Sequence, residues 1–227
     1  MQGTYGGEMT HDFDEDYWET HWRQAEGHGA EREIVPNPYL ARETGGLAPG
    51  TALDAGCGEG TEAIWLARAG WQVTAVDISA EALSRASERA TGMGAPPDRV
   101  EWVKADLGAW EPGRRFDLVT TRYAHPAMPQ LEFYERISEW VAPRGTLLIV
   151  GHVHTPDTIR RGIEQRHDVG GHHPPEEASV TAAGVAARLD ATQWDVVTAE
   201  ERTRTLTDRA ARAAELTDVV VRATRRS

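Results

Sequence analysis

The chain has 227 residues, a formal net charge of −12 and a single cysteine, so we expect one domain over 1–227, without a disulfide framework and in the cytoplasm. The negative charge repels phosphate backbones and anionic bilayer surfaces, which argues against nucleic acid and membrane as partners and favours a small molecule. No apolar run is long enough to span a bilayer, and both a monomer and a homodimer are compatible with the sequence.

The first 48 residues contain an aromatic-rich segment. Its aromatic side chains recur at the spacing of one helix face, which predicts a short helix over 17–24. The segment Pro36-Asn37-Pro38 then stiffens the chain before a second short helix over 39–43. We expect residues 1–48 to form a helical arm that covers the ligand edge of a core over 49–227.

A glycine turn joins an apolar strand pattern to a helical pattern at Leu53-Asp54-Ala55-Gly56-Cys57-Gly58-Glu59-Gly60. Parallel sheets bind nucleotides at such turns, because glycine lets a ligand approach the backbone without meeting a Cβ and the next helix offers unpaired N–H groups. The following strand ends in Asp77, about twenty residues on, where a carboxylate can accept both hydroxyls of a ribose. A turn without a ligand, with Asp77 as a helix cap, is the alternative.

The glycine spacing also favours one nucleotide over another. A dinucleotide fingerprint needs glycine at position 61, where this chain has Thr61, and the third glycine is Gly60. The pattern resembles the first motif of the class I S-adenosylmethionine (SAM)-dependent methyltransferases, apolar-Asp-x-Gly-x-Gly-x-Gly. Three later segments are similar to those of the family in the same order: Trp102-Val103-Lys104-Ala105-Asp106-Leu107, Phe116-Asp117-Leu118-Val119-Thr120-Thr121 and 140–149.

The resemblance implies an α/β fold, a Rossmann-like doubly wound seven-stranded sheet that is mostly parallel with an antiparallel C-terminal hairpin. Strand and helix signals alternate along the chain, as this fold requires. A long segment at 155–178 predicts a loop, which at such a length is often functional. The predicted elements are strands over 51–55, 72–76, 100–104, 116–121 and 146–151, helices over 61–69, 80–90 and 130–141, and hairpin strands over 194–202 and 218–225.

The resemblance further implies S-adenosyl-L-methionine as cofactor and S-adenosyl-L-homocysteine (SAH) as product. Asp77 would then bind the ribose, and Asp106 would meet the adenine amino group unless it only caps the turn after its strand. Cys57 is expected beside the ligand and not as a nucleophile. The expected cofactor contacts are Asp54, Gly56, Cys57, Gly58, Gly60, Asp77, Ile78, Asp106, Leu107 and Thr121.

Histidines gather between positions 125 and 173, and some follow strand ends at the expected active edge. We expect His125, His152 and His154 to contact the substrate or to act as a general base, with surface loop histidines as the alternative. No metal is expected, since members of this class that use magnesium employ carboxylates. Further substrate contacts are expected from aromatic residues, which attract a sulfonium unless they only seal the core, and from polar residues nearby: Tyr17, Trp18, Trp22, Asn37, Arg122 and Tyr123.

The segment after the fourth strand bears on the acceptor. It reads Thr120-Thr121-Arg122-Tyr123-Ala124-His125-Pro126 and not Asn-Pro-Pro-Tyr, which argues against nucleic acids and protein amides. The aromatic arm and the Pro-Asn-Pro segment look most like the tellurite-resistance and thiopurine-type branch of small-molecule methyltransferases. This implies methylation of S, N or O in detoxification or natural-product tailoring. A catalytically silent SAM-binding regulatory or interaction protein and an NAD-dependent oxidoreductase are the alternatives.

Overall fold

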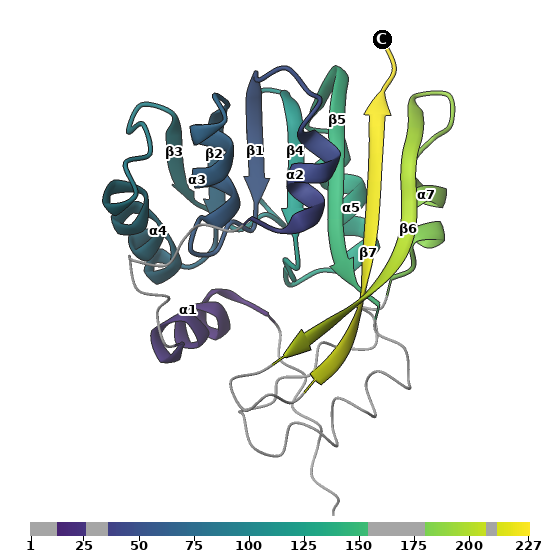
Figure 1. The fold of residues 1–227 in the computed structure, drawn as a ribbon. Coiled ribbons are helices and arrows are strands. Elements are labelled where there is room, and N and C mark those ends of the chain that lie inside the picture. The colour runs from purple at the N-terminus through teal and green to yellow at the C-terminus, as the bar shows by residue number, and fades with distance from the viewer. Residues whose placement is uncertain (1–12, 26–35, 154–179, 208–212) are drawn as a thin grey trace, which may run out of the picture.

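The computed structural model describes residues 13–25, 36–153, 180–207 and 213–227. Its centre is a seven-stranded sheet in the order β3-β2-β1-β4-β5-β7-β6 (Figure 1). Strands β1 to β5 pair in parallel, whereas β7 pairs antiparallel with β5 and with β6. The predicted α/β fold and its terminal hairpin are confirmed. The strands are β1 (Thr51–Ala55), β2 (Gln72–Asp77), β3 (Val100–Lys104), β4 (Phe116–Arg122), β5 (Val141–His152), β6 (Trp194–Thr207) and β7 (Ala213–Arg225).

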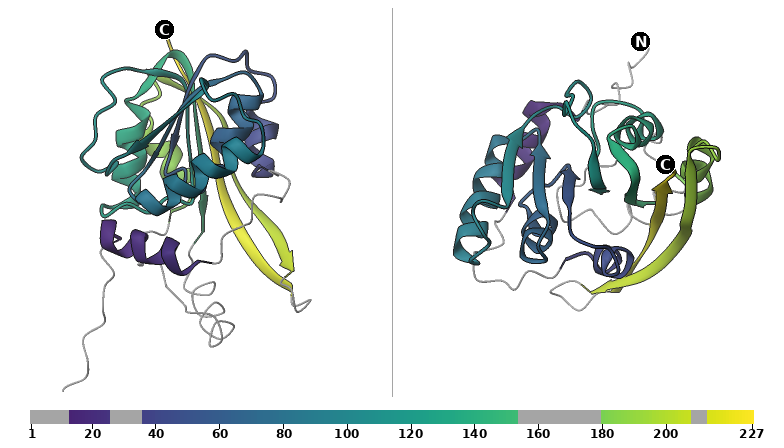
Figure 2. Two further views of the ribbon diagram at one scale, coloured as in Figure 1. Left: turned by 90° about the vertical axis from the view of Figure 1, so that its left-hand side faces the viewer. Right: turned by 90° about the horizontal axis from the view of Figure 1, so that it is seen from above.

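Helices cover both faces of this sheet (Figure 2). On one face lie α2 (Pro38–Thr44), α3 (Thr61–Arg68) and α4 (Ala80–Gly92), and on the other lie α5 (Gln130–Ser138) and α7 (Ala182–Arg188). The alternation along a strand separates the two cores: Leu53 belongs to the cluster that contains Phe133 of α5, whereas its neighbour Ala52 belongs to the cluster that contains Leu66 of α3. Burial on both faces accounts for the apolar strand sequences.

Short side chains begin the helices near the site, as local sequence predicts. The Ser79 hydroxyl accepts the Ala82 N–H at 3.1 Å and starts α4. The Asn37 side chain accepts the Tyr39 N–H at 3.0 Å and starts α2, with Pro38 at the first helical position. Each bond satisfies an amide that the helix leaves without an internal partner. These caps set the positions of the helices relative to the strand ends.

Among the described residues, four predicted boundaries were wrong by three or more positions, and one helix was missed. The helix predicted over 130–141 ends at Ser138, because Val141 pairs with Phe116 and joins the buried sheet. β5 therefore includes the Pro-Arg-Gly turn, where Arg144 has a φ of 67°. The hairpin strands run further than expected, to 207 and from 213. The alanine-rich helix α7 was not predicted, and the predicted loop at 155–178 lies outside the described residues.

The sheet order arranges the site. The carboxyl ends of the parallel strands point toward α1 (Glu15–Gln24), which lies beyond them (Figure 1). Because β3, β2, β1 and β4 are neighbours in that order, the segments that follow them lie in the same order along the edge. Among the helices that the structure describes, none is both long enough and apolar enough to cross a bilayer.

Candidate active site

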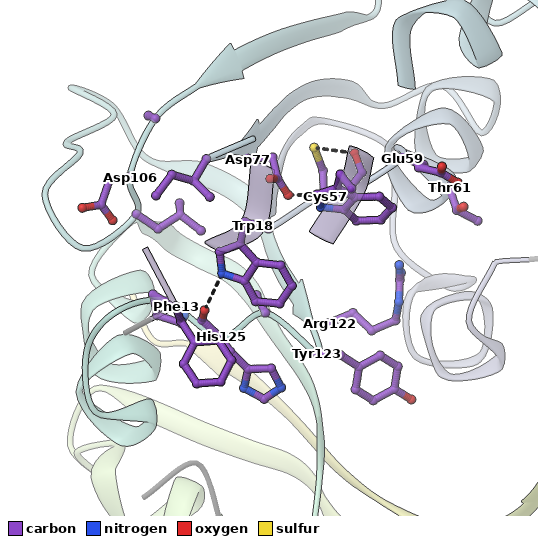
Figure 3. A pocket seen from close by; sticks show the side chains of 18 residues that line it. Phe13, Trp18, Cys57, Glu59, Thr61, Asp77, Asp106, Arg122, Tyr123 and His125 are labelled. Atoms are coloured by element: carbon purple, nitrogen blue, oxygen red, sulfur yellow. Dashed lines mark hydrogen bonds between the residues drawn. The ribbon is translucent and has the colours of Figure 1, made fainter. Parts of the chain in front are cut away.

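A cavity of about 300 Å³ lies at the carboxyl edge of the sheet, between the strand ends and the N-terminal arm (Figure 3). This volume is at the small end of the range for small-molecule sites. Its wall combines the glycine turn, the ends of β2, β3 and β4, and aromatic residues of the arm. The lining residues are Phe13, Trp18, Trp22, Gly56, Cys57, Gly58, Glu59, Thr61, Asp77, Ile78, Ala105, Asp106, Leu107, Arg122, Tyr123, Ala124, His125 and Pro126.

Backbone conformation explains the glycines of the turn. Gly56, Gly58 and Gly60 all have positive φ, at 79°, 50° and 72°, a region that side chains disfavour. A Cβ on Gly56 would lie 2.4 Å from the Ala124 Cβ, and one on Gly58 would lie 3.0 Å from Trp22 Cζ2. These two glycines line the cavity. Gly60 does not line it: a Cβ there would lie 2.5 Å from Trp102 Cη2 of β3 and 2.9 Å from Ala86 Cβ of α4, so its role is close packing against these two elements.

Asp77 is held at the end of β2 by backbone amides. Its carboxylate accepts the Gly58 N–H at 2.8 Å and the Ser79 N–H at 3.0 Å. Burial raises the pKa of this carboxyl above its usual value, and the two N–H bonds oppose the rise. A carboxylate can accept about four hydrogen bonds, so Asp77 keeps capacity for ligand hydroxyls while it caps the turn. The cap and the ligand contact are therefore compatible functions of one side chain.

Asp106 and Cys57 also line the cavity, as expected, with different roles. The exposed Asp106 side chain accepts the Gly108 N–H at 2.8 Å, so the capping alternative is real, yet the residue remains on the cavity wall. Burial, with Asp77 and Asp54 nearby, raises the pKa of the Cys57 thiol well above its ordinary range. The thiol stays protonated, which agrees with a wall residue and not with a nucleophile. Ile78 and Leu107 complete this side of the wall.

Asp54 and Thr121 do not line the cavity, although both were expected to touch the cofactor. Burial raises the pKa of Asp54 to about 6, against the opposing effects of Arg122 and of an N–H bond from Ala63. Thr121 is buried and donates its hydroxyl to the Ala55 carbonyl at 2.8 Å, which links β4 to β1. The strand register directs the two side chains into the core on opposite faces of the sheet, because Asp54 pairs with Thr120 and Thr121 with Ala55.

Arg122 lines the cavity, and a carboxylate outside the cavity lining balances its positive charge. Arg122 forms an ion pair with Glu62, a buried residue of α3 that was not predicted. Glu62 also accepts the Asn37 N–H at 3.0 Å. Burial lowers the pKa of the Arg122 guanidinium, and nearby Asp54 opposes this change. A buried charge needs such partners, so the pair fixes the end of β4 against α3 and the arm.

The end of β4 carries His125 into the cavity beside two arm residues. The Trp18 Nε1–H donates to the His125 carbonyl at 3.1 Å, and the Phe13 and His125 rings are 5.9 Å apart between centroids. Figure 3 shows the Trp18 indole across the cavity between Asp77 and His125. Burial lowers the pKa of His125 below its ordinary 6.5, with a smaller contribution from His152 in the same direction. The imidazole is therefore neutral at physiological pH.

His152 lies outside the cavity lining and belongs to a separate polar network. Its ring stacks on Tyr123, with centroids 4.0 Å apart, and its Nδ1 is 3.1 Å from Asp218 Oδ1. Arg204 Nε donates to Asp218 Oδ2 at 2.5 Å. Burial raises the pKa of Asp218, but the hydrogen bonds from His152 and Arg204 outweigh it and lower that pKa overall. His154, the third expected histidine, lies outside the described residues.

Tyr123 connects this network to the cavity. It has a φ of 51°, which turns the chain at the end of β4. Its hydroxyl donates to Asp218 Oδ1 at 3.1 Å and accepts from Asn37 Nδ2 and Arg204 Nη2, each at 3.2 Å. Burial and then the Asp218 carboxylate raise its pKa to about 12. Asn37 therefore supports a wall residue and does not line the cavity itself.

The arm is anchored at several points that sequence reasoning did not predict. Glu19 of α1 accepts the Ser79 hydroxyl at 2.7 Å and the Glu81 N–H at 3.3 Å, at the start of α4. Lys104 pairs with Glu15 at 2.6 Å. Tyr17 does not line the cavity; its ring packs edge-on against Phe13 and Trp18. Trp18 and Trp22 line it as expected.

Six lining residues were missed. Five of them lie next to a predicted contact in the sequence, and this proximity is the signal that could have found them. Phe13 lies beyond the predicted arm helix, and its φ of 46° turns it into the cavity. The missed residues are Phe13, Glu59, Thr61, Ala105, Ala124 and Pro126.

Comparisons with known proteins agree with this site. Residues 52–145 match the family model described as "Methyltransferase domain". An uncharacterized methyltransferase of Mycobacterium tuberculosis is 40% identical over 113 residues, which cover 49% of this chain and 54% of that protein. The "Probable thiol methyltransferase 2" of Arabidopsis thaliana is 30% identical over 152 residues, which cover 64% of this chain and 61% of that protein. The solved structure of TehB from Haemophilus influenzae superposes with a TM-score of 0.60 at 17% identity, covering 94% of this chain and 67% of that one.

Residues 52–145 form a methyltransferase domain, and the strand order and the glycine turn agree with the class I SAM-dependent methyltransferases, whose cofactor is SAM. The family predicted from the sequence is confirmed. The chain spans about half the length of the mycobacterial relative and about three fifths of the plant one. The activities and substrates of those proteins therefore apply to this chain only as a proposal.

Proposed function

We propose that this protein transfers a methyl group from SAM to a sulfur, nitrogen or oxygen atom of a small molecule. One observation carries the proposal: a single cavity contains the glycine turn with Asp77 at one side and a half-buried neutral His125 at the other. The first side suits a nucleoside and the second suits an acceptor that must lose a proton. A protein that only binds SAM has no need of the second side.

The residues present suit SAM. Asp77 offers a carboxylate to ribose hydroxyls, and Asp106 and Leu107, at the β3 end, would flank the adenine. Gly56 and Gly58 carry no Cβ, and the positions of their neighbours leave no space for one. A ligand can therefore approach the backbone of the turn closely. Trp18 and Trp22 present aromatic faces, which attract a positively charged sulfur. The carboxylates that line the cavity also attract the positively charged sulfur.

The order of strands supports an acceptor position on the β4 side of the cavity. Asp106 follows β3 and Asp77 ends β2, whereas Arg122 to Pro126 follow β4 on the other side of β1. A nucleoside placed over β3 and β2 leaves the β4 side for the reacting centre. That side is lined by Phe13, Trp18, Ala124 and Pro126, which suits a small and partly apolar acceptor.

Bound SAM supplies a methyl group on a cationic sulfur, and as the acceptor lone pair forms its bond to the methyl carbon, the electrons of the carbon–sulfur bond return to sulfur. The chain mainly holds the acceptor in line, and such positioning accounts for much of the acceleration. His125, neutral near physiological pH, takes the acceptor proton. Aromatic residues of the arm exclude water from the cavity.

The class of acceptor is a small molecule with a thiol, amine or hydroxyl. The likeness to a probable thiol methyltransferase supports a heteroatom acceptor. The resemblance to the tellurite-resistance and thiopurine-type branch supports detoxification or natural-product tailoring as the role. A cytoplasmic monomer or homodimer without nucleic acid or membrane partners belongs to the same proposal.

Calorimetric titration with SAH and, in parallel, with NAD is the first experiment. We expect micromolar binding of SAH and no binding of NAD, since the third glycine of the dinucleotide fingerprint is replaced by Thr61. Binding of NAD alone would overturn the proposal in favour of an oxidoreductase. Binding of neither would mean that the glycine turn is only structural.

A screen of acceptors then separates an enzyme from a silent binder. Thiols, amines and phenols are incubated with the protein and methyl-labelled SAM, and transferred label is measured. We expect turnover of at least one acceptor that falls in the His125→Gln variant. Tight SAH binding with no turnover of any class would instead support a regulatory SAM-binding protein.

A further inference from the structure

Gln130 is a buried polar residue outside the cavity lining that contacts the candidate base. It begins α5, five positions after His125, and only 3% of it is exposed. Its Nε2 donates to the Ala124 carbonyl at 3.0 Å, and its Oε1 is 3.1 Å from His125 Nδ1. One amide therefore bridges two consecutive residues of the acceptor wall.

The chemistry of the partners orients this amide. The Ala124 carbonyl can only accept a hydrogen bond, so the amide nitrogen must face it. Burial raises the pKa of the Tyr134 hydroxyl strongly, and a hydrogen bond from Gln130 opposes that rise, as donation to the phenol oxygen would. Donation toward Ala124 and Tyr134 leaves the amide oxygen toward His125. An oxygen at that position can only accept, so Nδ1 must carry the proton.

We infer that Gln130 is a positioning residue that holds neutral His125 as the Nδ1–H tautomer and so places the basic lone pair on Nε2. The inference rests on the proposed function for its catalytic meaning, but the tautomer itself can be measured without an acceptor. The acceptor proton then moves to Nε2, and the amide oxygen continues to accept from Nδ1–H as the ring becomes positive. Orientation of a base by a third group is a general device in catalysis.

The other contacts given for His125 by the described residues act in different ways. His152 acts on the ring through charge and lowers its pKa. The Trp18 Nε1–H donates to the backbone carbonyl of His125, and the Phe13 ring lies tilted against the His125 ring, with the centroids 5.9 Å apart. Among the contacts described for the ring nitrogens of His125, the bond to Gln130 is the one that distinguishes Nδ1 from Nε2.

Nitrogen-15 NMR of histidine-labelled protein tests the tautomer directly. The His125 signals are assigned by their loss in His125→Gln, and Gln130→Leu and Gln130→Glu are compared with the wild type. We expect a pyrrole-type Nδ1 and a pyridine-type Nε2 in the wild type and in Gln130→Glu, and a loss of this pattern in Gln130→Leu. A wild-type ring protonated on Nε2, or an unchanged pattern in Gln130→Leu, overturns the inference.

Kinetics test the catalytic consequence once an acceptor is known. We expect Gln130→Leu to lower kcat roughly tenfold with KM and SAH affinity nearly unchanged, and to have no further effect in a His125→Gln background. Losses that multiply in the double variant would mean a structural role and overturn the inference. Gln130→Glu should recover activity and move the acid limb of the pH profile upward, because a carboxylate raises the pKa of the imidazole.

A matched control shows whether the loss of a glutamine amide at another position has the same effect. Gln72→Leu makes the same change at an exposed residue that begins β2, where the amide donates to the Asp98 carbonyl. We expect wild-type kinetics and an unchanged His125 signal in this variant. Absence of turnover in the wild type would count against the proposed function, whereas the NMR pattern decides the role of Gln130 separately.

Discussion

The two sides of the cavity are built in different ways. The proposed cofactor side consists of the backbone of one short turn, Gly56 to Gly58, and one carboxylate, Asp77, which accepts the Gly58 N–H. The acceptor side uses side chains from distant parts of the chain: Trp18 and His125, joined by a hydrogen bond, are 107 positions apart. One side depends on local spacing and the other on the tertiary fold.

This difference indicates which side can vary without loss of the other. Replacement of a side chain at the acceptor wall leaves the backbone of the glycine turn in place. The same fold can therefore bind different methyl acceptors. A change in the turn should affect every reaction, because the proposed cofactor contacts come from backbone at glycines where an added Cβ would crowd its neighbours. Variants on the two sides should therefore separate rate from cofactor affinity.

His125→Gln should have the largest effect, and on rate alone. We expect kcat to fall roughly 100-fold because a general base commonly contributes that much, while SAH affinity stays within calorimetric error. Since burial lowers the pKa of His125, activity in the wild type should persist as pH falls past 6.5, the ordinary histidine value, and decline only below it. A pH profile of kcat/KM measures this limb. A greater loss in His152→Gln would move the role to the pair with Asp218.

Asp77→Ala should affect the proposed cofactor side, through SAH affinity and stability. It removes the carboxylate that ribose hydroxyls need and the acceptor for two backbone amides, so SAH affinity should fall about 100-fold, and stability by about 1 kcal/mol through the lost cap. Calorimetry and chemical denaturation measure the two effects. Asp98→Ala, at an exposed loop position, is the matched control. Unchanged SAH affinity in Asp77→Ala would disprove the assignment of the cofactor side.

Gly58→Ala should have a smaller effect than Asp77→Ala on SAH affinity, at the same proposed cofactor side. Both Gly58 and Gly94 have positive φ, at 50° and 64°, but a Cβ on Gly94 meets nothing within 4 Å. Each substitution should cost about 1 kcal/mol of stability from backbone strain. Only Gly58→Ala should also weaken SAH binding, by roughly tenfold, because its Cβ crowds Trp22 and the ligand. Equal SAH affinity in the two variants would show that the turn keeps its distance from the cofactor.

Tyr123→Phe should have the smallest effect, at the outer limit of the acceptor side. It removes a hydroxyl that Asn37, Asp218 and Arg204 share, and the loss should be about 1 kcal/mol of stability. We expect the acceptor KM to rise roughly threefold as the wall loosens, with SAH affinity unchanged. Denaturation with urea and steady-state kinetics measure both. A large loss of SAH affinity would mean that the two sides are not independent.

Several features of the fold and the cofactor side could be predicted because they depend on short-range patterns. The glycine spacing, the strand that ends in Asp77 and the alternation of strands and helices are local, and the structure has them in the predicted order. Boundaries were less accurate where pairing outweighed local preference, as at Val141, which joins β5 by pairing with Phe116. The alanine-rich α7 lacks a strong periodic signal, so it was missed.

The sequence contained the chemistry of the acceptor side but not its assembly. His125 and His152 looked equivalent as strand-end histidines, yet one lines the cavity and the other binds Asp218 of β7. Gln130 carried no motif at all. Local spacing determines which backbone turns can form, because it acts through neighbouring residues. Which side chains meet in one cavity depends on strand order and packing over the whole chain, and these are long-range properties that only the folded molecule specifies.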